Sequence, residues 1–109
     1  MADYIDKQEM TNEIKSYREL CQKARDEGKE KPQVPKSLML KLMMMVDGIA
    51  RRPNFRDYSF LDEMKSRAIE NCFKKANYFD PEKSNNPFGF YSKLIWREFV
   101  NVIKDEEIE

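Results

Sequence analysis

The chain has 109 residues, and its 20 Lys and Arg are balanced by 20 Asp and Glu, with no histidine and only three glycines. This length suits one domain with a modest core, and a formal net charge of zero argues against a protein that holds DNA through charge alone. An enzyme is also disfavoured, because the chain offers no histidine, no glycine-rich phosphate loop and no nucleophile or metal pattern.

The sequence implies no cofactor, no metal and no membrane segment. Cys21 and Cys72 are too few and too far apart for a zinc site without histidine, so both are expected to be buried or free thiols. The apolar run 38–46 is interrupted by Lys41 and is far shorter than a membrane span, and the N-terminus lacks a signal peptide. We therefore expect a cytoplasmic protein.

The first helix is predicted over residues 7–27, and a flexible, charged linker ending in two prolines is predicted over 28–35. Apolar side chains recur along the helix at alternating four- and three-residue steps, which builds one buried stripe. The stripe consists of Met10, Ile14, Tyr17, Cys21 and Ala24.

A second helix is predicted to begin near Ser37 and to end around Arg52-Pro53. Leu38, Leu42, Met45 and Ile49 share one side, and Met39, Met43 and Val46 widen the apolar surface. This pattern favours a helix at the centre of the core. The methionines alternatively suit an adaptable protein-binding surface, because thioether chains repack easily.

A third helix is predicted to start at Ser59, because Ser59 with Asp62 three residues later resembles a capping box. Phe79-Asp80-Pro81 would end it. Leu61, Met64, Ala68, Cys72 and Ala76 can face inward, which leaves Glu63, Lys65, Ser66, Arg67 and Glu70 on a charge-mixed outer side.

The last helix is predicted to begin at Asn86-Pro87, since Asn is a favoured N-cap and Pro at the first helical position loses no hydrogen bond. Its packing face has apolar residues at helical spacing: Phe88, Tyr91, Ile95, Phe99 and Val102. A second face interleaves rings and cations: Phe90, Lys93, Arg97, Asn101 and Lys104, with Trp96 and Val100 at its margin.

This second face has the composition of a surface that grips a nucleic-acid strand. Flat rings stack on unpaired bases at roughly 1–3 kcal/mol per base, while Lys and Arg neutralise the phosphates. The alternative is an ordinary amphipathic helix whose basic edge is solvated.

The arrangement of these residues resembles region 2 of bacterial RNA polymerase sigma factors, and most closely the late sigma factors of T-even-like bacteriophages. The resemblance covers most of the chain. It rests on Phe79-Asp80, Asn86-Pro87, Phe90, Phe99-Val100 and Ile103-Lys104, and upstream on Arg52, Asn54-Phe55, Tyr58, Glu63-Met64, Ile69-Glu70 and Lys74.

The resemblance implies an all-α fold, a compact bundle of about four helices formed by residues 1–109 as a single sigma region 2-like domain. Residues 1–34 would be the N-terminal helix and linker, and residues 36–107 the core helices. Such a module docks on the clamp helices of the largest subunit of core RNA polymerase and stabilises the melted minus-ten-like promoter element, mainly the non-template single strand, for late transcription initiation. A phage co-activator and a sliding clamp are further partners that it suggests.

Position by position, the resemblance makes residues 60–77 the polymerase-facing helix. The docking positions would be Glu63, Ser66, Arg67, Glu70 and Phe73. The DNA-facing positions would be Phe88, Phe90, Tyr91, Lys93, Trp96, Arg97, Val100 and Asn101, with Lys104 and the basic residues of 51–56 holding the flanking backbone. Arg97 would read the upstream edge of the element in the major groove.

The chain departs from the family pattern in three places. Lys93-Leu94 stands where cellular sigma factors carry paired tryptophans, and Arg67-Ala68 replaces the usual acidic residue and glycine. The tail DEEIE lacks the apolar clamp-binding peptide of the phage relatives, and no downstream DNA-reading domain follows. We expect either that the chain is a fragment or that partner proteins perform those tasks.

The other class of function that the sequence allows is a helical adaptor or transcription regulator. Such a protein would bind RNA polymerase or another protein without contacting DNA. It would not need Phe90, Lys93, Trp96 and Arg97 together, whereas a sigma-type module would.

Overall fold

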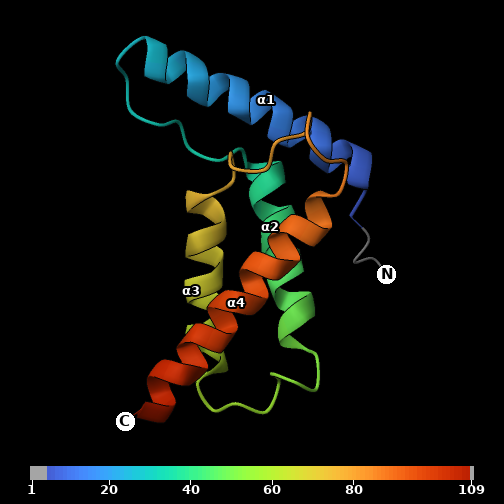
Figure 1. Cartoon of the computed structure of the whole chain (residues 1–109), viewed down its shortest axis with the longest axis vertical. Coiled ribbons are helices and arrows are strands. Elements are labelled where there is room, and N and C mark those ends of the chain that lie inside the picture. Colours follow the sequence, from blue (N-terminus) through green and yellow to red (C-terminus); the bar gives the residue numbers. More distant parts are fainter. Residues whose placement is uncertain (1–4, 109) are drawn as a thin grey trace.

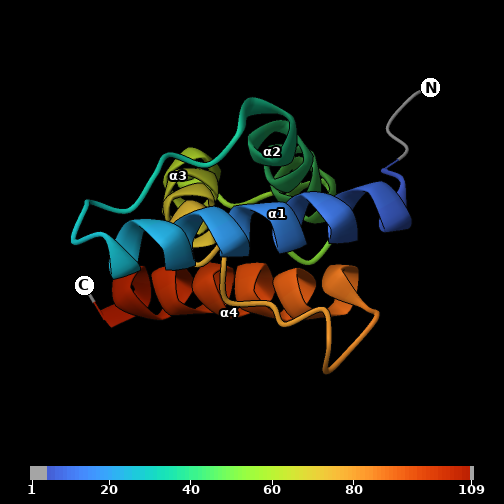
Figure 2. The same cartoon turned by 90° about the horizontal axis from the view of Figure 1, so that it is seen from above.

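In the computed structural model, which describes residues 5–108, the chain is all-α, and the described part contains four helices (Figure 1). These are α1 (Lys7–Asp26), α2 (Lys36–Ala50), α3 (Leu61–Lys74) and α4 (Pro87–Ile108). α2 and α3 stand side by side, α4 crosses one face of this pair obliquely, and α1 lies across the end of the bundle (Figures 1 and 2). The predicted all-α bundle of about four helices is confirmed.

α1 forms as its apolar pattern predicts. Asp6 caps it, since its carboxylate Oδ1 accepts a hydrogen bond of 2.9 Å from the backbone N–H of Glu9. Met10, Ile14, Tyr17 and Cys21 are buried on one side, while Ala24 is half-buried. The outer side of α1 is exposed and, apart from Leu20, polar.

Residues 27–35 connect α1 to α2 without regular structure, as predicted, but fixed contacts hold them against the bundle. The hydroxyl of Tyr17 donates to the carbonyl of Pro32 at 2.7 Å, and the Lys31 ammonium donates to the carbonyl of Lys74 at 2.6 Å. Val34 is buried in the core. The prediction of a flexible linker therefore missed these contacts, all of which involve residues distant in the sequence.

α2 is central, with Leu38, Leu42, Val46 and Ile49 buried. Val46 rather than Met45 occupies the middle of this buried side, and Met45 is half-buried beside it.

α3 differs from prediction at both ends. It begins at Leu61 with Phe60 at the N-cap and no side-chain capping bond, so the expected cap at Ser59 is wrong. It ends at Lys74, three residues before the expected end. The C-terminal carbonyls of Lys75 and Ala76 instead accept hydrogen bonds from the hydroxyl of Tyr91.

Cys21 and Cys72 are both buried free thiols, as the sequence predicts. Burial raises the pKa of the Cys72 thiol to about 12, and the nearby Glu98 carboxylate adds to that rise. Cys72 therefore behaves as a small apolar side chain between α3 and α4.

α4 begins as its Asn-Pro pair predicts. The side-chain Oδ1 of Asn86 accepts a hydrogen bond of 3.0 Å from the backbone N–H of Gly89. Pro87 is the first helical residue and is buried. A Cβ added to Gly89 would collide with the side-chain amide of Asn86, so alanine at this position would have to displace the capping side chain.

This geometry predicts opposite effects for alanine at two helical glycines. Gly48→Ala in α2 meets open space and should raise the free energy of unfolding by about 0.5–1 kcal/mol, because Ala loses less backbone entropy than Gly in a helix. Gly89→Ala displaces the Asn86 cap, worth about 1 kcal/mol, and should give no gain or a loss.

Urea unfolding followed by circular dichroism measures both effects. In an Asn86→Ala background the cap is already absent, so Gly89→Ala should then stabilise the protein as Gly48→Ala does. A gain from Gly89→Ala in the unmodified chain would contradict the capping role.

Candidate nucleic-acid interface

α4 presents three distinct sides because one of them is buried. Tyr91, Ile95, Phe99 and Val102 are fully or almost fully buried against α2 and α3, as predicted for the packing face. Successive residues of an α-helix turn by about 100°, so burial of this stripe sets the direction of every other side chain. The remaining residues divide into a groove side and a Trp96 side.

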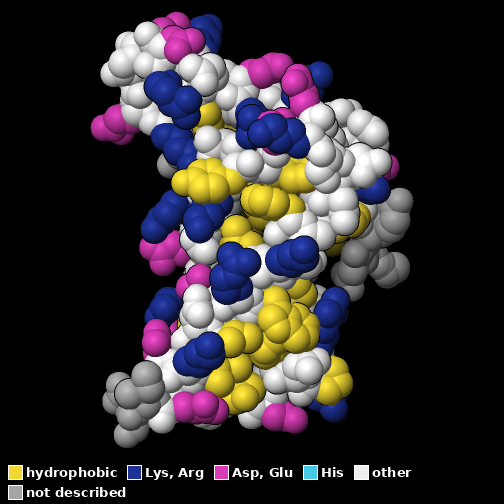
Figure 3. All heavy atoms as spheres, viewed as in Figure 1, with side chains coloured by type: hydrophobic (Ala, Val, Ile, Leu, Met, Phe, Trp, Pro, Cys, Tyr) yellow, Lys and Arg dark blue, Asp and Glu magenta, His cyan; other side chains and the backbone are white. Residues whose placement is uncertain are grey.

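The groove side carries part of the predicted strand-gripping face. A groove of about 920 Å³ lies along α4 and is bounded on its other side by segment 75–86. Phe90, Lys93, Arg97 and Asn101 of α4 all line it. Figure 3 views this side of α4, where Lys and Arg side chains lie between two gatherings of hydrophobic side chains.

Phe90 is anchored yet accessible. Its side chain is 38 % exposed, and its ring makes edge contacts with Phe79 (centroids 5.7 Å apart) and Tyr91 (4.9 Å). These contacts restrict the ring while part of it stays open to a ligand. A restrained, partly exposed ring suits base stacking, because little side-chain entropy remains to be lost.

The cations of α4 lack acidic partners, whereas the two acids that line the groove, Asp80 and Glu98, each lie beside an arginine. Within residues 5–108, no carboxylate oxygen lies within 4 Å of the charged groups of Lys93, Arg97 or Lys104. Glu98 lies 3.7 Å from Arg67, and Asp80 lies 3.9 Å from Arg18. The positive charge of α4 is therefore available to an anionic ligand.

Segment 75–86 adds residues that the sequence analysis did not assign to the site. Lys75, Tyr78 and Lys83 line the groove opposite α4, and the Lys75 ammonium lies 5.8 Å from the Tyr78 ring centroid. Tyr78 is one of the most exposed aromatic side chains. Their mixture of rings and cations resembles that of α4, and this composition is the sequence signal that could have assigned them to the site. Only the fold, however, brings the two segments face to face.

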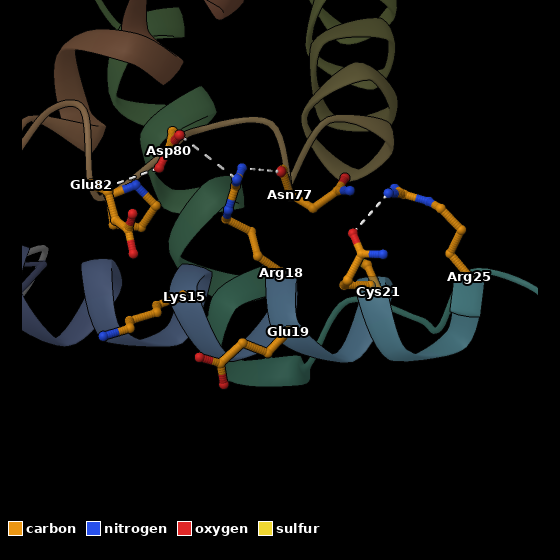
Figure 4. Close-up of a pocket in the computed structure, with 10 residues that line it drawn as sticks. Lys15, Arg18, Glu19, Cys21, Arg25, Asn77, Asp80 and Glu82 are labelled. Carbon is orange, nitrogen blue, oxygen red and sulfur yellow. Dashed lines mark hydrogen bonds and ion pairs between the residues drawn. The ribbon is translucent and has the colours of Figure 1, made fainter. Parts of the chain in front are cut away.

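Arg18 of α1 holds this segment in place, which no local pattern indicated. Its guanidinium donates to the carbonyls of Asn77 (2.8 Å) and Phe79 (3.1 Å) and pairs with Asp80. Figure 4 shows Arg18 reaching from α1 to this segment, at the edge of a second cavity of about 460 Å³. α1 thus positions Phe79, on which the Phe90 ring packs.

Trp96 lies on a different side of α4 from Phe90. Its ring packs at 4.6 Å against Phe55, and the guanidinium of Arg52 lies 5.8 Å from its centroid. Neither Trp96 nor Val100 lines the groove. The predicted face is therefore divided, and the structure does not bring Trp96 together with Phe90 and Arg97.

Two of the predicted DNA-facing rings belong to the packing of the bundle. Tyr91 has no exposed surface, and its hydroxyl is 2.9 Å from the carbonyl of Lys75 and 3.0 Å from that of Ala76. Burial also raises the pKa of its phenol. Phe88 is half-buried against the core. Tyr91 offers a base no surface, because the turn of the helix directs it inward.

The predicted docking positions on α3 are only partly on its open side. Glu63, Ser66 and Glu70 are exposed, and Phe73 is half-buried against the core. Arg67 pairs with Glu63 of its own helix at 3.9 Å and turns toward α4, where it lies 3.7 Å from Glu98 and 3.6 Å from Asp105. Arg67 thus ties α3 to α4, while the open side of α3 is acidic.

Other kinds of site find no support in the described residues. Within residues 5–108, no three His, Cys, Asp or Glu side chains are grouped so that they could hold a metal ion. None of the described helices combines the length and the apolar character needed to cross a bilayer.

Comparison of the chain with protein-family models, with curated proteins and with solved structures finds no match in any of the three.

The position of Tyr91 predicts a purely structural role for its hydroxyl. Tyr91→Phe leaves two carbonyls at the end of α3 without their donor and should lower the free energy of unfolding by about 1–3 kcal/mol. Single-stranded DNA binding, measured below the unfolding transition, should not change. A loss of DNA affinity in a fully folded Tyr91→Phe protein would contradict this assignment.

Proposed function

We propose that this chain is a sigma region 2-type module that docks on core RNA polymerase through α3 and holds one strand of opened promoter DNA along the groove side of α4. The observation that supports it best is the groove itself. There a restrained Phe90 ring, the unpaired cations Lys93 and Arg97, and a second basic and aromatic wall line one channel.

The groove suits a separated strand better than a duplex. Bases that leave their stack can rest on Phe90 and Tyr78, while Lys75, Lys83, Lys93 and Arg97 lie within the same groove to meet phosphates. No nucleotide hydrolysis is required, because stacking and phosphate contacts can trap a strand that opens thermally. Arg97 is the residue proposed to read a base edge.

The zero net charge of the chain agrees with a module that binds DNA only inside a larger complex. Phosphate contacts supply most sequence-independent affinity, so a few cations give weak binding unless another protein adds charge. The exposed carboxylates Glu63 and Glu70 on the outer side of α3 supply a surface of opposite sign for a docking partner.

The first test separates strand capture from docking. The double substitution Phe90→Ala with Arg97→Ala removes a stacking surface and an unpaired cation, and should lower promoter opening by at least about tenfold, which corresponds to the loss of one stacked base. Opening is measured with core RNA polymerase on an AT-rich late-type promoter carrying 2-aminopurine. Association with core polymerase, measured by pull-down, should not change.

Leu20→Ala with Arg25→Ala is the matched control, because it removes an exposed apolar side chain and an arginine from α1, outside the groove. Full promoter opening by the Phe90 and Arg97 variant would exclude strand capture by α4.

The second test addresses docking. Glu63→Lys with Glu70→Lys reverses the charge of the outer side of α3 and should abolish retention of the chain on core polymerase, while the weak affinity for single-stranded DNA persists. Glu19→Lys with Glu30→Lys makes the same change of charge outside α3 and serves as the control. If the unmodified chain is not retained by core polymerase, the adaptor function without DNA contact becomes the better explanation.

A further inference from the structure

α4 carries a second apolar stripe that the bundle covers only in part. Trp96, Val100 and Ile103 are spaced by four and three residues, so they share one side of the helix. Each of the three comes one residue after a buried residue of α4, namely Ile95, Phe99 or Val102. It therefore points about 100° away from that buried residue around the helix axis. The stripe therefore lies at the edge of the core and does not line the groove.

The stripe is held in place but remains partly open. Trp96 is 36 % exposed, and Val100 and Ile103 are half-buried. The Trp96 ring is fixed by Phe55 and by Arg52, both from the segment between α2 and α3. Figure 3 shows hydrophobic side chains gathered beside the lower part of α4, with Lys and Arg side chains above them and on either side and Asp and Glu side chains along their lower edge.

Cations border most of the stripe, and Glu107, four residues after Ile103, is an exposed carboxylate at its C-terminal end. Lys93 lies three residues before Trp96, Lys104 lies four residues after Val100, and Arg52 covers the indole from the other segment. None of these three side chains has a carboxylate within 4 Å in the part of the chain that the structure describes. An apolar stripe bordered by unpaired cations is complementary to an apolar stripe bordered by carboxylates.

We propose that Trp96, Val100 and Ile103 form a docking surface for an amphipathic helix of a partner protein, in which Asp and Glu flank the apolar residues. Helix recognition commonly uses anchors at this four- and three-residue spacing. The surface suits a nucleic acid less well, because two of its three side chains, Val100 and Ile103, offer no ring for stacking. This inference does not depend on the proposed function, since the stripe and the groove occupy different sides of α4.

The chain contains its own reporter for the test, because Trp96 is its single tryptophan. The probe is a synthetic helical peptide without tryptophan, with leucines on one face and glutamates on either side of them. Its titration should shift the Trp96 emission to shorter wavelength and saturate. An isomer with lysines in place of the glutamates should bind at least about tenfold more weakly, because like charges then face each other.

Val100→Glu should weaken binding of the glutamate peptide by at least about tenfold, since it places a charge in the middle of the stripe. Leu40→Glu is the matched control, because Leu40 is also an exposed apolar residue, 48 % exposed, but lies on α2. Circular dichroism verifies that both variants are folded. Arg52→Ala is a milder substitution, which should also lower the affinity for the glutamate peptide because it removes a bordering cation.

Three outcomes would overturn the proposal. One is that neither peptide shifts the Trp96 emission, or that both bind equally well. Another is that Val100→Glu and Leu40→Glu have the same effect. The third is that a single-stranded oligonucleotide, anionic lipid vesicles or a second copy of the chain changes the Trp96 emission while the glutamate peptide does not. Phe90→Ala with Arg97→Ala should leave peptide binding intact, so failure of strand capture and failure of docking are distinguishable.

Discussion

The burial of Tyr91, Ile95, Phe99 and Val102 against α2 and α3 determines how the rest of the molecule is presented. A helix turns by a fixed angle per residue, so burial of this stripe fixes the direction in which every other side chain of α4 points. Phe90 and Arg97 then face segment 75–86, whereas Trp96 faces the segment between α2 and α3. Burial of one stripe of α4 thus leaves two separate exposed surfaces on the same helix.

Although the chain has no net charge, this arrangement places positive and negative charges on different surfaces. Of the acids of α4, Glu98 and Asp105 lie beside Arg67 of α3, while Glu106 and Glu107 are exposed near its C-terminal end. Within the described part of the chain, no carboxylate lies within 4 Å of the α4 cations Lys93, Arg97 and Lys104. The outer side of α3 keeps exposed carboxylates at Glu63 and Glu70. The total charge therefore says little about binding, because charges of opposite sign are gathered on different surfaces.

α1 and the ordered connections give the groove its second wall. Arg18 bonds to two carbonyls of segment 77–79, and the Tyr91 hydroxyl bonds to the carbonyls just before it. The backbone of this segment has few regular hydrogen bonds of its own, so these side chains satisfy groups that burial would otherwise leave unpaired. A connection that is irregular in sequence becomes a defined surface because two neighbouring elements hold it.

The sequence by itself determined the helices and much of their buried faces. Periodic apolar residues predicted α1 and the inner side of α4, and Asn86-Pro87 predicted the start of α4, because these signals act within one or two helical turns. Only the tertiary structure decided that Arg67 turns to α4 and that Phe90 and Trp96 lie against different neighbouring segments. Each of these outcomes depends on which neighbour a side chain meets across the bundle. Periodicity specifies the angle between two residues of one helix, but the direction in which that helix packs is set by contacts between residues far apart in the chain.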